Sequence, residues 1–97
     1  MVMTQQYLAG ELSLLLAQLQ AVATVQVVTR DVAGLRREVE TRPVTALAST
    51  VVRAMSLADA LCWDSVGRGD GAAFSRQAAV SAQLYEFGLC AGLLEED

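Results

Sequence analysis

The side chains that could do chemistry in this chain are arginines, carboxylates and two cysteines, because histidine and lysine are both absent. Their absence removes the imidazole base, the amine of a Schiff base and the commonest nitrogen ligand of metal sites. Two cysteines without histidine do not form a zinc site, and the Glu-x-x-His pairs of a di-iron bundle do not occur. The sequence therefore predicts no catalytic residue, no cofactor and no metal site. The one enzymatic alternative uses carboxylates and arginines alone.

The two cysteines, Cys62 and Cys90, are predicted to stay reduced. If they lie on the two arms of a helical hairpin, Cys90 is roughly 22 Å further along the hairpin than Cys62. A disulfide needs Cα atoms within about 7 Å, so we expect no internal bridge, and a bond between two copies stays open. Thiol catalysis needs a base or a nearby cation, for which the same helix faces offer only Arg53 or Arg76.

Composition and net charge limit the classes of protein to which this chain can belong. The chain has 97 residues, of which 54% are hydrophobic and 19% charged, with a net charge of −4. A single domain of this size buries about 60–70% of its unfolded surface, too little to cover so much apolar area. This favours a homodimer, although an alanine-rich chain whose methyl groups tolerate water is the alternative. The acidic balance predicts no binding to nucleic acid.

The location is predicted to be cytoplasmic. Residues 1–6 carry no positive charge, as a secretory signal would require. Arg53 and Asp59 interrupt the apolar stretch 44–63, so we expect no membrane span. Lysine, asparagine and isoleucine are absent while alanine, valine, arginine and glycine are abundant, which is typical of a high-GC bacterium.

Hydrophobic spacing predicts an all-α chain of three helices, at about 4–40, 43–66 and 70–94, in a single domain. Thr4 is the expected N-cap of the first helix, Pro43 opens the second, and Asp70 caps the third. Gly67 is the expected end of the second helix. The glycine-rich turn at 67–71 folds the second and third helices into an antiparallel hairpin.

The stretch 24–29 is the weakest part of the first helix, because most of its residues are β-branched. It reads as helix, as a bend or as a strand, and no second strand-like run exists to pair with it. A continuous helix over 4–40 would be longer than the hairpin, so we expect a second copy of the chain to cover the part that extends beyond the hairpin. The fold expected is an antiparallel three-helix unit paired into a dimeric bundle.

The first functional hypothesis is a non-enzymatic protein that self-associates and presents an acidic surface to an unidentified protein partner. Its dimer interface is predicted to be the stripe Leu8, Leu12, Leu15, Leu19 and Val22. The hairpin core is predicted to contain Trp63, Phe74, Leu84 and Phe87. An exposed Trp63 would instead indicate a hot spot for binding.

The second hypothesis is a small-molecule-binding module, regulatory or accessory to an enzyme. Its apolar pocket is predicted to be formed by Trp63, Leu84, Phe87 and Gly88, with Arg53 or Arg76 holding an anionic group. Gly88 and Gly92 also fit two other interpretations: a close approach of another helix, or the end of the third helix.

Overall fold

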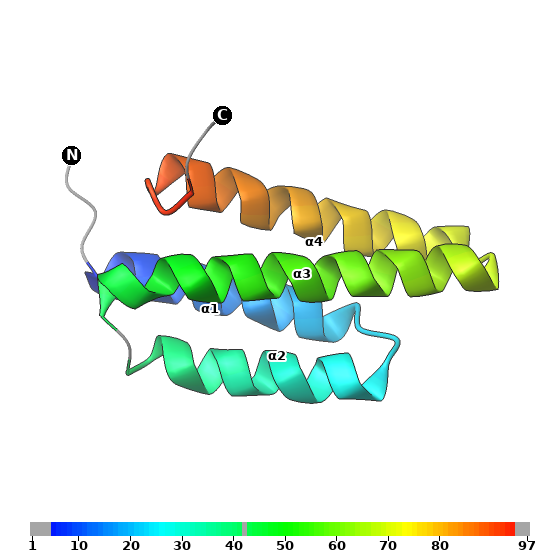
Figure 1. The fold of residues 1–97 in the computed structure, drawn as a ribbon, viewed down its shortest axis with the longest axis horizontal. Coiled ribbons are helices and arrows are strands. Elements are labelled where there is room, and N and C mark those ends of the chain that lie inside the picture. Colours follow the sequence, from blue (N-terminus) through cyan, green and yellow to red (C-terminus); the bar gives the residue numbers. More distant parts are fainter. Residues whose placement is uncertain (1–4, 42, 95–97) are drawn as a thin grey trace.

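A computed structural model describes residues 5–41 and 43–94, and within them the chain forms four helices and no strand (Figure 1). The helices are α1 (Gln5–Ala21), α2 (Gln26–Val39), α3 (Val44–Arg68) and α4 (Gly71–Cys90). Successive helices run in opposite directions, so the fold is an antiparallel up-and-down bundle. Helix α1 packs against all three other helices, whereas α2 and α4 lie at opposite corners. The predicted all-α class is confirmed.

The single first helix over 4–40 is wrong, because the described chain reverses at 22–25 and forms α1 and α2 instead. Val25 has an extended backbone, with φ −118° and ψ 125°, and no side chain caps α2 there. The chain thus reverses direction within the β-branched stretch 24–29, and residues 26–29 of this stretch form the first turn of α2. The predicted three-helix unit is therefore replaced by a bundle of four helices.

The core lies between the four helices and belongs to one chain. Leu8, Leu12 and Leu19 of the predicted dimer interface are buried there, and Leu16 replaces Leu15 in the innermost row. Leu15 and Val22 are partly buried and pack against this core. The other buried aliphatic residues are Val28, Val32, Leu35, Val39, Leu47, Val51, Ala54, Ala58, Leu61, Ala73, Val80 and Leu84. Leu8, Leu12 and Leu19 of the predicted α1 stripe therefore pack within the chain's own bundle.

The turn between α3 and α4 lies two residues beyond the expected end of the second helix. Gly69, and not Gly67, takes the left-handed conformation, with φ 71°. The amide of Asp70 donates to the carbonyl of Ser65 over 2.9 Å, which completes a Schellman motif. The Asp70 carboxylate accepts from the amide of Ala73 over 3.0 Å, which confirms the predicted N-cap.

Gly88 and Gly92 both take part in the turn that ends α4. Gly92 has φ 72°, and the amide of Leu93 donates to the Gly88 carbonyl over 2.8 Å, as in a second Schellman motif. A Cβ added at Gly88 would lie 2.6 Å from Cγ of Leu94 and 3.3 Å from Cγ1 of Val51. Gly88 thus permits the chain's own last residues to fold back onto the bundle, and α4 ends at Cys90, not at 94.

One described helix, Thr45–Arg68 within α3, is long and apolar enough to cross a membrane by length and composition. A core helix of a bundle passes the same test. Leu47, Val51, Ala54, Ala58 and Leu61 recur every three or four positions on α3 and are all fully buried. These five residues form the buried face of α3, and 33% of its apolar window is buried in the bundle.

Candidate functional site

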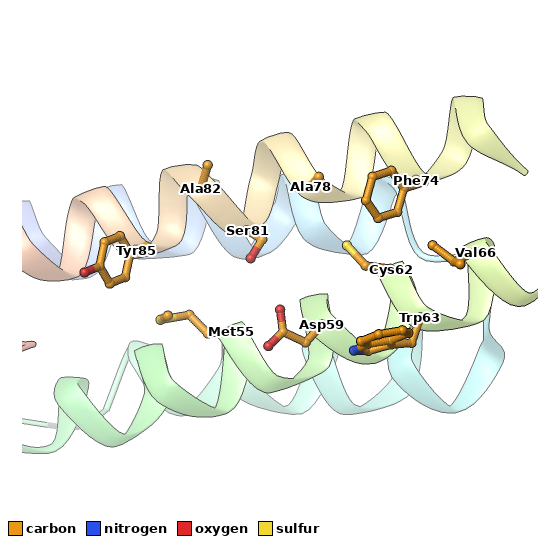
Figure 2. Close-up of a pocket in the computed structure, with 10 residues that line it drawn as sticks. All are labelled: Met55, Asp59, Cys62, Trp63, Val66, Phe74, Ala78, Ser81, Ala82 and Tyr85. Atoms are coloured by element: carbon orange, nitrogen blue, oxygen red, sulfur yellow. The ribbon is translucent and has the colours of Figure 1, made fainter.

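A groove of about 680 Å³ lies between α3 and α4 (Figure 2). Its size falls in the range of about 300–1,000 Å³ that is usual for small-molecule sites. We call it the α3–α4 groove. It is lined by Met55, Asp59, Cys62, Trp63 and Val66 of α3 and by Phe74, Ala78, Ser81, Ala82 and Tyr85 of α4.

Both helices build their wall with the same spacing, in steps of four, three, one and three residues. This spacing keeps side chains on one helical face, beside the stripe that enters the core. On α4 the three middle residues are small, and Phe74 and Tyr85 stand at the two ends (Figure 2). The groove exists because Ala78, Ser81 and Ala82 are too short to fill the space opposite α3.

Of the described residues that line the groove, only Asp59 is charged. Its carboxylate points from α3 into the gap between the two helices (Figure 2). Among the described residues, none forms a hydrogen bond or an ion pair with Asp59. The pKa of the half-buried Cys62 thiol is raised above its ordinary value, first by burial and second by the negative charge of Asp59. The groove therefore combines apolar walls with an unneutralised negative charge.

The structure brings only one of the predicted pocket residues to this groove. Trp63 lines it and is 76% exposed, so its placement in the hairpin core is wrong. Phe74, also predicted in the core, is 38% exposed and faces the same groove. Leu84 and Gly88 are buried in the bundle, and Phe87 is half-buried against the core. None of these three residues lines the α3–α4 groove.

The two predicted anion-binding arginines lie away from the groove. Nη1 of Arg53 is 3.1 Å from Oε2 of Glu38, so this side chain is paired with α2 on another face. Arg76 is exposed on α4 and does not line the groove. The charge that the structure places beside Trp63 is thus negative, where the sequence-based hypothesis expected a positive one.

A second polar site lies inside the bundle, around the fully buried Gln77. Nε2 of Gln77 donates to the carbonyl of Val22 over 3.0 Å and to Oγ1 of Thr24 over 3.2 Å. Oε1 of Gln77 accepts from the buried Ser65 hydroxyl over 2.7 Å. Arg68 also donates to Oγ1 of Thr24 over 3.0 Å. This Gln77 cluster (Val22, Thr24, Ser65, Arg68 and Gln77) ties the α1–α2 reversal to α3 and α4.

Both cysteines are free within the chain; Cys62 is partly buried and Cys90 is exposed. In the part of the chain that the structure describes, no group of three or more His, Cys, Asp or Glu side chains could hold a metal ion. The arrangement can therefore bind an apolar molecule and offer it one carboxylate. Comparisons with protein-family models, with curated proteins and with solved structures found no match.

Proposed function

We propose that this protein is a non-enzymatic helical module that binds a small apolar molecule in the α3–α4 groove. The observation that carries this proposal is the concentration of exposed apolar side chains there. Trp63, Val66, Phe74 and Tyr85 all line the groove, while the other exposed large hydrophobic residues are dispersed. Those others are Tyr7, Leu14, Val27 and Val52. A hollow with aromatic walls and few polar groups has the composition of a ligand site.

The groove supports binding more than catalysis. Its titratable groups are the Asp59 carboxylate, the Cys62 thiol and the Tyr85 hydroxyl. The raised pKa of Cys62 keeps this thiol protonated near neutral pH, in which form it is a poor nucleophile. None of the described lining residues is a basic side chain that could activate it.

A second candidate function is protein–protein interaction in the cytoplasm, either with another protein or between two copies. The 76% exposure of Trp63 favours it, because tryptophan is enriched among residues that dominate binding energy. A homodimer would then use the α3–α4 face, since the leucine stripe of α1 is covered within one chain. Sedimentation at several protein concentrations distinguishes a dimer from a monomer.

The proposal is tested with Nile red, a neutral apolar dye. Trp63 is the single tryptophan of the chain, so its fluorescence reports on the groove directly. We expect saturable binding of the dye, with a change in tryptophan emission.

Ser81→Leu should abolish this binding, because the larger side chain fills the floor of the groove. Gln83→Leu is the matched control, since Gln83 is exposed on the same helix and does not line the groove. Equal binding by the two variants, or no saturable binding by the native chain, would overturn the proposal.

A further inference from the structure

We infer that the ligand of the α3–α4 groove is an apolar organic cation, whose charge lies beside Asp59 and whose apolar body packs on the aromatic walls. This inference rests on the proposed function and specifies the chemical class of the ligand. It is carried by the charge of the groove, by its three aromatic side chains and by the position of Asp59 among them.

The protein itself does not neutralise the negative charge of the groove. Asp59 is the only charged lining residue, and the described part of the chain gives it no ion-pair partner. A cation that enters the groove would displace water and lower the local dielectric constant, which strengthens its attraction to the carboxylate. An anion of the same shape would be repelled by the same group. The groove therefore selects ligands by the sign of their charge.

The aromatic residues favour the same ligand class. Trp63, Phe74 and Tyr85 line the groove, and Trp63 and Phe74 face it from opposite helices (Figure 2). Asp59 and Trp63 are one helical turn apart, about 6 Å along the axis. A cation held by Asp59 thus lies within reach of an aromatic ring, and the negative face of such a ring attracts positive charge.

The same carboxylate argues against a second copy of the chain as the occupant. A two-fold dimer that joins groove to groove places each residue near the centre close to its own copy. Asp59 lies near the middle of the α3 wall, so two carboxylates would approach each other with no lining cation between them. Removing two like charges from water without a counter-charge is unfavourable.

The test compares two ions that share four phenyl groups around one central atom and carry opposite charges, tetraphenylphosphonium and tetraphenylborate. Each is titrated into the native protein while the Trp63 fluorescence is recorded. We expect the phosphonium to bind at least about tenfold more tightly than the borate, a difference of about 1.4 kcal/mol. Asp59→Asn should reduce this preference to within about twofold, and Asp59→Glu should retain it.

Glu86→Gln is the matched control, because Glu86 is exposed on α4 outside the groove and its loss changes the net charge equally. It should leave the preference unchanged. If both ions bind equally to the native protein, or if Glu86→Gln acts like Asp59→Asn, the inference of a cationic ligand is wrong. In that case binding of Nile red would still support the proposed function. If neither ion nor Nile red binds, the proposed function itself fails.

Discussion

The α3–α4 groove and the Gln77 cluster both place polar groups among apolar side chains of α3 and α4, yet they differ in how those groups are satisfied. Inside the bundle, Gln77 has a hydrogen-bond partner for its oxygen and for its nitrogen. No buried side-chain nitrogen or oxygen of the described residues lacks a partner. In the groove, Asp59 has no ion-pair or hydrogen-bond partner among the described residues.

This difference separates polar groups that stabilise the fold from one that is available to a ligand. A buried amide must form its hydrogen bonds within the protein, because leaving them unmade costs free energy. A carboxylate that faces water retains its hydration until a ligand replaces it. We therefore expect changes in the Gln77 cluster to alter stability, and changes in the groove to alter binding.

Among changes to polar side chains, Gln77→Ala is expected to give the largest effect, lowering the free energy of unfolding by about 3 kcal/mol. The change removes three hydrogen bonds, so that the buried Ser65 hydroxyl and the Val22 carbonyl both lose this partner. Urea denaturation followed by circular dichroism measures it. Gln83→Ala, at an exposed position of the same helix, should stay within about 0.5 kcal/mol of the native chain. Similar losses from both variants would contradict a special role for the buried glutamine.

Ser65→Ala should lower the free energy of unfolding by about 1–2 kcal/mol, because only the bond to Oε1 of Gln77 is lost. The double variant with Gln77→Ala should lose less stability than the sum of the two single variants, since they share this bond. The same urea titrations supply the double-mutant cycle. Full additivity would mean that the two side chains do not act together.

Trp63→Ala should change stability by less than about 1 kcal/mol, because the side chain is largely in water. The same variant should lose most of its Nile red binding, measured by the emission of the dye. Leu84→Ala provides the contrast, with a loss of about 2–5 kcal/mol at a fully buried position of α4. A large loss of stability in Trp63→Ala would show that this side chain belongs to the fold.

Asp59→Asn should give the smallest effect, an increase of roughly twofold in the alkylation rate of Cys62 by iodoacetamide near pH 8. The charge of Asp59 contributes to the raised pKa of Cys62, so its removal lowers that pKa and increases the thiolate fraction. Burial is the larger cause and remains in the variant. The assay uses Cys90→Ser proteins, so that only one thiol reacts. A slower reaction would contradict the sign of this interaction.

Local signals predicted much of the fold. The helical class, the start of α3 after Pro43 and the cap at Asp70 depend on residues near each other in sequence. The reversal at 22–25 was not predicted, because its β-branched residues fit several structures. Gln77 and Arg68 hold that reversal from 55 and 44 residues away in the chain.

The site was harder to predict than the fold. Trp63 is apolar enough for a core, and only the packing of Leu61 and Ala58 shows that it belongs to the neighbouring face. The repeated spacing on α3 and α4 was present in the sequence as a second stripe. This stripe lines a groove only because Ala78 and Ser81 leave space. That space becomes apparent only when the two helices are placed side by side.

The bond from Gln77 to Val22 also has a consequence for protein synthesis. The ribosome makes a chain from its amino end, so α1 and α2 emerge before the side chain that fastens their reversal. Until then, the nascent α1 and α2 lack both the Gln77–Val22 hydrogen bond and the two helices that cover their leucines. The finished bundle can therefore assemble only after α4 has left the exit tunnel.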